Sequence, residues 1–165
     1  MLFENAVIKT EGEYDKALSK LGSEKETKEI IPLSVADIEV VHSDMIARYG
    51  GSDGIRDNGL LLSVVSAPYQ TFGGEDLYPT LHDKAAKYLL DFARYQIFVD
   101  GNKRAALATA STFLLVNGEQ MGLTNDEAYD LVMSIANGRI TEVEQVSQIL
   151  EEKSVPLSFD NEIER

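Results

Sequence analysis

The sequence predicts an all-α fold, in which five or six helices surround one buried central helix and a short loop or hairpin lies over the bundle. Three observations support this class. Four helix-start patterns recur along the chain, and apolar residues follow each of them at helical spacing. Residues 105–116, with the sequence AALATASTFLLV, are apolar on almost every side, which is typical of a fully buried helix. No strand pattern competes, except for a brief hairpin near residues 70–78.

Each helix start pairs a hydroxyl side chain with a carboxylate three residues later. In this capping-box arrangement the two side chains satisfy amide groups that the first turn of a helix leaves free. The four pairs are Ser34 with Asp37, Thr80 with Asp83, Thr124 with Glu127, and Thr141 with Glu144. We therefore expect one helix to begin directly after each of these hydroxyl residues.

The ends of two helices are also marked in the sequence. Gly50-Gly51 follows the first apolar face, residues 35–46, and Asn117-Gly118 follows the central helix. Both pairs are typical of residues that terminate helices. The other expected apolar faces run through residues 81–92, 131–136 and 143–150.

A chain of 165 residues fits a single domain. We expect this domain to occupy residues 31–153, with a charged N-terminal extension over residues 1–30 and a mobile acidic tail over residues 154–165. The segment from Pro68 to Pro79, PYQTFGGEDLYP, contains two glycines and two prolines and has no helical period. It is therefore expected to form a loop or a short hairpin.

Composition excludes several classes of function. The chain has no cysteine, which rules out disulfides and thiolate metal sites. No stretch approaches the roughly 18 apolar residues of a membrane span, and the first residues lack a signal-peptide pattern, so we expect a cytoplasmic protein without a membrane partner. A net charge of −13 argues against direct binding of nucleic acid, which depends on clustered Lys and Arg.

One stretch of this acidic chain is basic. Residues 84–104 contain five basic and two acidic residues, so they carry +3 and leave −16 for the rest of the chain. Such a region can attract a compact anion such as a nucleotide phosphate, although basic residues are also often scattered without function. The basic residues are Lys84, Lys87, Arg94, Lys103 and Arg104.

The segment most informative about function joins the second expected helix to the central one. Asp100 and Gly101 favour a tight turn, and a glycine lets a ligand approach the backbone closely. The next residues open a helix whose free N–H groups and dipole attract anions, and Asn102, Lys103 and Arg104 add donors there. We therefore predict a phosphate site, with the Asp100 carboxylate placed to hold a magnesium ion.

Each of these residues also has an ordinary structural interpretation. Asp-Gly-Asn is a common turn, and an aspartate in the position of Asp100 often caps the following helix. Phe98 alone is typical of a core residue. Lys103 and Arg104 are equally compatible with solvated side chains in a first helical turn.

Taken together, Phe98 to Arg104 (FVDGNKR) resembles the core motif of the Fic/Doc superfamily. That motif reads His-x-Phe-x-Asp/Asn-Gly/Ala-Asn-Lys-Arg in the death-on-curing (Doc) branch. The resemblance covers roughly residues 31–150 and implies the helical fold of that family. Further stretches similar to family landmarks are Ala47–Gly51, Ile55–Leu60, Tyr69–Gly74, Leu77–Pro79, Lys84–Ala86 and Phe113–Gly118.

Two side chains indicate the branch. AMP-transferring Fic enzymes resemble one another in having Gly at the position of Lys103 and a second Arg at the position of Leu107, so this chain is more similar to Doc. The resemblance implies a toxin that uses ATP and Mg²⁺ to move the terminal phosphate onto a hydroxyl of translation elongation factor Tu. It also implies an antitoxin of the prevents-host-death type, and a flap formed by residues 68–79 that aligns the target peptide.

The catalytic base of the family is missing. In the family a histidine two residues before Phe98 takes the proton of the target hydroxyl, but this chain has Gln96 there. An amide cannot accept that proton near neutral pH, and loss of a general base costs about 10²- to 10⁴-fold in rate. Neither other histidine replaces it: His82 lies about 21 Å away along a helix, and His42 is expected to be a packed or partly exposed helix residue.

We therefore expect a Doc-type toxin with Gln96, Asp100, Lys103 and Arg104 as its catalytic residues. Gly101, Asn102, Lys103 and Arg104 would bind the nucleotide, and Asp100 would bind the metal. Three explanations of Gln96 remain open: a deliberate replacement that protects an expression host, a natural pseudoenzyme, or slow transfer that relies on positioning and charge. The alternative functions are an AMP-transferring Fic-type enzyme and a catalytically silent nucleotide- or protein-binding module.

Overall fold

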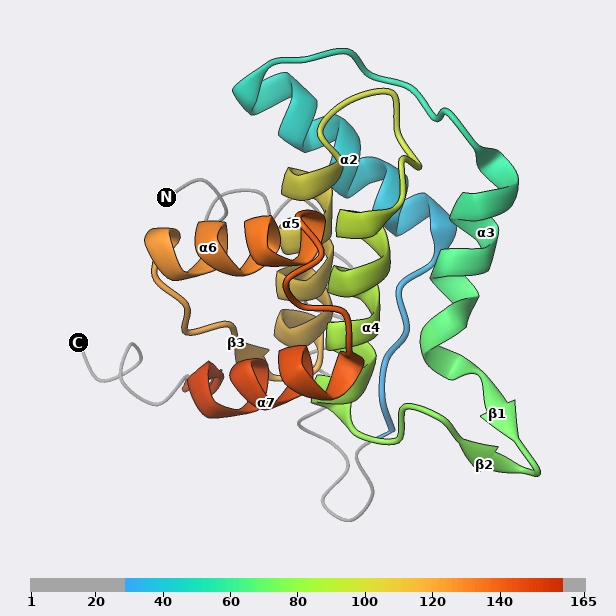
Figure 1. Ribbon diagram of the computed structural model, residues 1–165, viewed down its shortest axis with the longest axis vertical. Helices are drawn as coiled ribbons and strands as arrows, with labels where there is room; N and C mark the ends of the chain where they lie inside the picture. The colour runs from blue at the N-terminus through green and yellow to red at the C-terminus, as the bar shows by residue number, and fades with distance from the viewer. Residues whose placement is uncertain (1–28, 159–165) are drawn as a thin grey trace.

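A computed structural model describes residues 29–158 (Figure 1). Within this range the chain forms six α-helices: α2 (Val35–Tyr49), α3 (Asn58–Ser66), α4 (Leu81–Arg94), α5 (Asn102–Val116), α6 (Asn125–Ala136) and α7 (Val143–Lys153). The other elements are a 3-10 helix, η1 (Ala67–Tyr69), and four two-residue strands, β1 (Thr71–Phe72), β2 (Glu75–Asp76), β3 (Glu119–Gln120) and β4 (Val155–Pro156). The predicted all-α fold of five or six helices with a short hairpin is confirmed.

Helix α5 is the buried centre of the bundle, as the sequence predicts. Eleven of its 15 residues are buried, and α4, α2 and α6 all pack against it (Figure 1). Alanines in its first turns let the neighbouring helices approach closely. Further along, Phe113 is fully buried and meets the ring of Tyr88 edge-on, with 5.1 Å between the ring centroids. Burial of these apolar side chains is the main force that holds the bundle together.

Three of the four predicted capping boxes are present. Ser34, Thr80 and Thr124 cap α2, α4 and α6, and in each case the carboxylate three residues on accepts a bond from the N-cap amide. The fourth prediction was wrong by one residue. The N-cap of α7 is Glu142, whose amide donates to Gln145 Oε1 at 3.3 Å. A glutamine oxygen accepts at this position as well as a carboxylate does, so Thr141 is left outside the helix.

Helix α3 was not predicted. Its sequence, NGLLLSVVS, contains a glycine and two valines and lacks the carboxylate of a capping box. Asp57 nevertheless caps it by accepting a bond from Leu60 N at 2.9 Å. Leu61 and Val64 are buried against the core, so tertiary packing supplies the stability that the local sequence lacks.

The predicted hairpin in residues 68–79 is confirmed and is short. Strands β1 and β2 are antiparallel, with Thr71 opposite Asp76 and Phe72 opposite Glu75. The hairpin precedes α4, so it lies at the N-terminal end of that helix, at the bottom of Figure 1.

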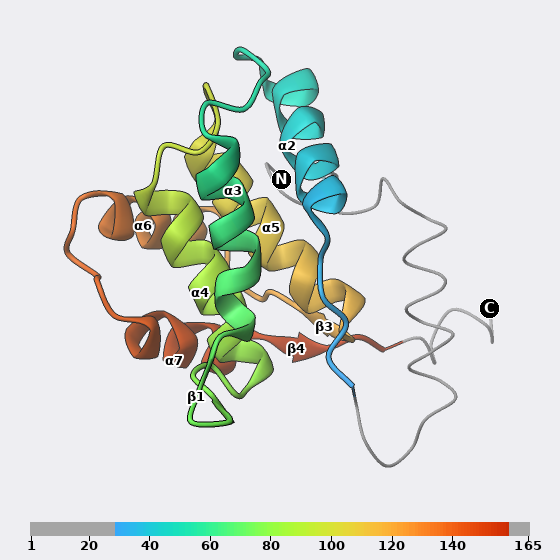
Figure 2. The same cartoon turned by 90° about the vertical axis from the view of Figure 1, so that its right-hand side faces the viewer.

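A second strand pair was missed. Figure 2 shows β4 running beside β3, with Glu119 opposite Pro156 and Gln120 opposite Val155. Residues 155–157, which belong to the segment expected to form a mobile tail, therefore pair with residues 118–120 of the domain. Residues 159–165 of that segment, and residues 1–28 of the expected N-terminal extension, lie outside the described residues. None of the helices described is long and apolar enough to cross a membrane.

Candidate functional site

The loop between α4 and α5 is held against the segment that joins α2 to α3. Val99 N donates to Gly54 O at 3.0 Å, and Arg56 N donates to Ile97 O at 2.8 Å. Ile55 and Phe98 form an isolated antiparallel bridge between these bonds. The predicted site loop is therefore held by backbone pairing to a segment about 40 residues earlier in the chain, which restricts its movement.

Asp100 lies at the tip of this loop, and each of its carboxylate oxygens accepts one backbone bond. Oδ1 accepts from Gly101 N at 2.8 Å, and Oδ2 accepts from Ser52 N at 3.2 Å. The amides of Gly101 and Ser52 hold the pKa of Asp100 below its ordinary value, so the carboxylate is charged at neutral pH. Asp100 does not cap α5, because the N-cap is Gly101 with φ 76° and no side-chain cap bond.

The free amides at the start of α5 begin one residue later than the sequence suggests. The Gly101 N–H is already bonded to Asp100, so it is not available to a ligand. Among residues 29–158, the N–H groups of Asn102, Lys103 and Arg104 have no hydrogen-bond acceptor. These three groups form the positive end of the α5 dipole, which can bind phosphate oxygens.

The Asn102 side chain holds the loop in place. Its Oδ1 accepts from Phe98 N at 2.9 Å, and its Nδ2 donates to Phe98 O at 3.0 Å. Nδ2 also lies 3.5 Å from Gln96 Oε1, a long contact that turns the exposed Gln96 amide toward α5. The Asn102 amide therefore fixes the loop through Phe98, and its second N–H makes only the long contact to Gln96.

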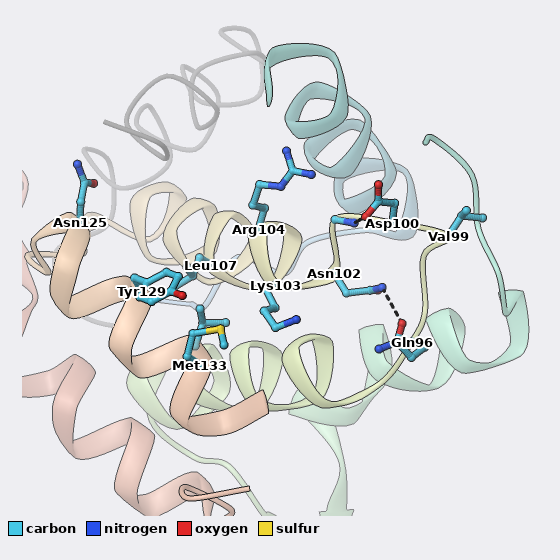
Figure 3. A pocket seen from close by; sticks show the side chains of 12 residues that line it. Gln96, Val99, Asp100, Asn102, Lys103, Arg104, Leu107, Asn125, Tyr129 and Met133 are labelled. Carbon is cyan, nitrogen blue, oxygen red and sulfur yellow. Dashed lines mark hydrogen bonds between the residues drawn. The ribbon is translucent and has the colours of Figure 1, made fainter. Parts of the chain in front are cut away.

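The two cations at the start of α5 point to different sides of its first turn (Figure 3). Arg104 Nη2 donates to Gly50 O at 3.0 Å and lies on the side of Asp100. Lys103 is exposed, leaves α5 on the side opposite Arg104, and has no partner within the described part of the chain. The sequence predicted both charges at one place, whereas in the structure they line one cavity from different sides of α5.

That cavity has a volume of about 430 Å³ and contains every site residue that the sequence predicted. One end is polar and is formed by Gln96, Asp100 and residues 101–104. The other end is largely apolar, and its residues outside the site loop are Leu107, Asn125, Tyr129, Val132 and Met133. A pocket with a charged end and an apolar end suits a ligand that carries both phosphate and a ring.

Four of these lining residues, on α6, were missed by sequence reasoning. Tyr129 and Met133 lie four residues apart, on one face of α6 (Figure 3). Tyr129 is 60% exposed although it is a large aromatic residue. The helical period identified α6 as a helix, but no sequence signal shows which neighbour its exposed side chains face.

Most of the basic region predicted from the sequence is used for structure. Lys84 Nζ donates to Tyr78 O at 2.5 Å and to Pro68 O at 3.3 Å, which ties both ends of the hairpin to α4. Lys87 pairs with the buried Asp91 at 3.0 Å. Only Lys103 and Arg104 of the five basic residues line the cavity, so the local charge of +3 overstates the field at the site.

The hairpin does not lie beside the site. It precedes α4, whereas the site loop follows that helix, and 14 helical residues span about 21 Å. Figure 1 shows the two at opposite ends of α4. This location does not fit the flap role that the resemblance assigned to residues 68–79. Residues 50–57, on the α2–α3 connection, border the site instead.

The two histidines have different surroundings. His82 is bonded to Glu119 at 2.5 Å near the N-terminal end of α4, away from the site as expected. His42 is packed in the interior, which is one of the two placements expected for it, but it also contacts the site loop. Its Nε2 lies 2.6 Å from Asp100 O.

Within the described part of the chain, Asp100 is the only carboxylate that lines the cavity. Among the described residues, no group of three or more His, Cys, Asp or Glu side chains could hold a metal ion. One carboxylate completed by phosphate and water oxygens is the usual environment of Mg²⁺ in nucleotide sites. The residues present therefore fit a magnesium ion that arrives with a nucleotide.

Comparison with known proteins identifies the family. The profile of the Fic/DOC family matches residues 32–114, which include α2 to α4, the site loop and most of α5. The chain belongs to the Fic/DOC family. Toxin Doc of Mycolicibacterium smegmatis is 47% identical over 90 residues, which cover 53% of this chain and 69% of that protein. Protein kinase doc of Escherichia phage P1 is 34% identical over 109 residues, which cover 66% of this chain and 85% of that protein.

Both relatives bear the name of the Doc branch, which supports the branch indicated by Lys103 and Leu107. The Fic/DOC match ends at residue 114, within α5. The α6 residues that complete the cavity lie beyond it.

Proposed function

We propose that this Fic/DOC protein is a Doc-type toxin built to transfer the terminal phosphate of Mg-ATP to a protein hydroxyl. The observation that carries the proposal is the cavity at the start of α5. There a charged carboxylate, three free amides and two cations meet an apolar pocket. The name of the phage P1 relative, a protein kinase, supports the phosphoryl-transfer chemistry. The target expected by resemblance is translation elongation factor Tu.

The residues have distinct roles in this proposal. Asp100 would hold Mg²⁺ through its carboxylate, and the ion would supply positive charge to the phosphate oxygens. The amides of residues 102–104 would bind one phosphate group at the helix N-terminus. Lys103 and Arg104 would neutralise charge from opposite sides of the first turn of α5, with Arg104 on the Asp100 side. Phosphoryl transfer depends mainly on such positioning and charge stabilisation.

Gln96 limits the reaction. Its amide lies at the edge of the cavity, where it can orient a hydroxyl by hydrogen bonding but cannot remove a proton. Transfer by the chain as it stands would therefore be slower than with a histidine at this position by about 10²- to 10⁴-fold. The nucleotide site does not depend on that proton transfer and should still bind Mg-ATP.

Gln96 also favours one alternative, a catalytically silent module that binds nucleotide or protein. AMP transfer is the other alternative, but Leu107 offers no cation in the cavity to hold a triphosphate in the AMP-transferring orientation. A Doc-type toxin further implies a cytoplasmic antitoxin partner of the prevents-host-death type. That partner would cover the cavity with an added helix.

The substitution Gln96→His tests the proposal. We expect growth arrest on expression, and incorporation of labelled phosphate into elongation factor Tu that rises by about 10²- to 10⁴-fold over the starting chain. Gln96→Asn is the matched control, because it keeps an amide and should not gain activity. If Gln96→His gains neither effect, the silent binding module is supported instead. Mass spectrometry of the modified target distinguishes phosphate from AMP, and detection of AMP would overturn the Doc assignment.

A further inference from the structure

His42 is a buried polar residue directly beneath the site loop. Its side chain is 2% exposed, and its ring stacks on Phe98 with 3.8 Å between centroids and an interplanar angle of 5°. Its Nε2 lies 2.6 Å from the carbonyl oxygen of Asp100. A carbonyl oxygen only accepts hydrogen bonds, so Nε2 carries the proton and donates it.

This bond holds one end of the Asp100–Gly101 peptide. The carbonyl end is bonded to His42, and the N–H end is bonded to the Asp100 carboxylate at 2.8 Å. With both ends bonded, the peptide plane cannot turn, and Gly101 stays at φ 76° and ψ 23°. Residues 102–104, which follow this turn, line the cavity.

Loss of the His42 bond would release this peptide. The Asp100 carbonyl would lose its donor from α2, which costs free energy for a partly buried acceptor. Rotation of the peptide would bring that carbonyl oxygen toward water in the cavity. A carbonyl oxygen there repels phosphate, whereas the present arrangement directs it away.

The other ring nitrogen contributes less. Nδ1 lies 3.5 Å from Asp53 Oδ1, and the Asp53 side chain is 58% exposed. Asp53 is also bonded to Ser43 Oγ at 3.1 Å and to the amide of Gly54 at 2.8 Å. An exposed contact of this kind is worth little, so the link to Asp100 is the main polar interaction of the ring.

We propose that His42 is a positioning residue of the candidate site, which acts through the Asp100–Gly101 peptide to hold the α5 amides toward a bound phosphate. The part of this proposal that concerns nucleotide rests on the proposed function. The part that concerns the loop does not.

Two variants separate the hydrogen bond from the packing. His42→Phe keeps an aromatic ring for the stack on Phe98 but cannot donate to Asp100. His42→Gln can place an amide nitrogen near the position of Nε2 and restore the donor. We expect His42→Phe to weaken Mg-ATP binding by about tenfold in calorimetry, and His42→Gln to recover most of this loss. Amide hydrogen exchange at Gly101, measured without nucleotide, should accelerate in His42→Phe and return toward normal in His42→Gln.

The outcomes distinguish the two proposals. If the unsubstituted chain does not bind Mg-ATP, the proposed function fails, and the exchange at Gly101 still decides the role of His42. The positioning role would be overturned if amide exchange at Gly101 were unchanged in His42→Phe, or if His42→Phe and His42→Gln changed that exchange equally. The unsubstituted protein gives a test that does not depend on a variant folding: NMR should detect a protected Nε2 proton on His42, and a freely exchanging one would contradict the inference.

Discussion

Gly51 provides a sharp test of the Asp100 site, because a single methyl group there would strike the carboxylate. A Cβ at position 51 would lie 2.6 Å from Asp100 Oδ2 and 3.0 Å from Ile46 Cδ1. Real Cβ atoms essentially never approach other heavy atoms as closely as 2.6 Å. In Gly51→Ala the carboxylate must therefore move away from Ser52 N, which now donates to it at 3.2 Å.

Gly50→Ala is a matched control. Both glycines have positive φ, 85° at Gly50 and 114° at Gly51, so an alanine at either position is strained by about 1–3 kcal/mol. A Cβ at Gly50 meets no atom within 4 Å, so only the backbone cost applies there. Gly51→Ala should lose at least as much stability in urea unfolding as Gly50→Ala, which measures the backbone cost alone, and only Gly51→Ala should disturb the site.

We expect Gly51→Ala to weaken Mg-ATP binding by about tenfold or more, because a group that orients a metal ligand typically contributes 10- to 100-fold to affinity. Gly50→Ala should bind within about twofold of the unsubstituted chain. Isothermal titration calorimetry with Mg-ATP measures both affinities. Equal affinities in the two variants, with folding intact, would refute the argument that the Asp100 carboxylate holds the metal in this position.

Two further predictions follow from α4 and α6. In Lys87→Met the buried Asp91 loses its partner, so we expect the free energy of unfolding in urea at pH 7 to fall by about 3 kcal/mol. Lys153→Met is the control, because it breaks an exposed pair with Glu127 and should change the free energy of unfolding little. Burial already raises the pKa of Asp91 despite Lys87, and a carboxylate with a raised folded-state pKa binds more protons folded than unfolded. The loss of unfolding free energy in Lys87→Met should therefore shrink as the pH falls and Asp91 becomes protonated. A loss that does not change with pH would contradict its assignment to the unpaired Asp91 charge. Tyr129→Ala should leave the unfolding free energy nearly unchanged, because the ring is 60% exposed, but should weaken Mg-ATP binding severalfold, because the ring lines the apolar end of the cavity. Leu62→Ala on α3, which is 59% exposed and outside the cavity, is the control, and an equal effect of the two substitutions on binding would argue against a nucleotide contact by Tyr129.

The sequence predicted those features that depend on residues within a few positions of one another. Capping by Ser34, Thr80 and Thr124 involves atoms three residues apart, and the turn at Gly101 is closed by its neighbour Asp100. The apolar run of α5 could belong only to a buried helix. For the same reason the loop from Gln96 to Arg104 is recognisable as one site from its residues alone, because they are consecutive in the chain.

The exceptions were local patterns with weak signals. Helix α3 has poor intrinsic propensity and depends on the burial of Leu61 and Val64. Strands β3 and β4 are two residues each and meet across more than 30 positions of sequence. Neither α3 nor the β3–β4 pair has a periodic pattern long enough to predict it from the sequence.

By itself, the sequence determined the class of fold, the starts of α2, α4 and α6 and the residues of the candidate phosphate loop, because hydrogen bonding and helical periodicity act between near neighbours in the chain. Only the tertiary structure decided that His42 on α2 bonds to the Asp100 carbonyl, that Tyr129 and Met133 complete the cavity from α6, and that Lys84 bonds to the hairpin instead of lining the cavity. These contacts join segments up to about 60 residues apart. They depend on how the elements pack around α5. The spacing of residues along one helix does not predict which neighbouring element its outer face will contact.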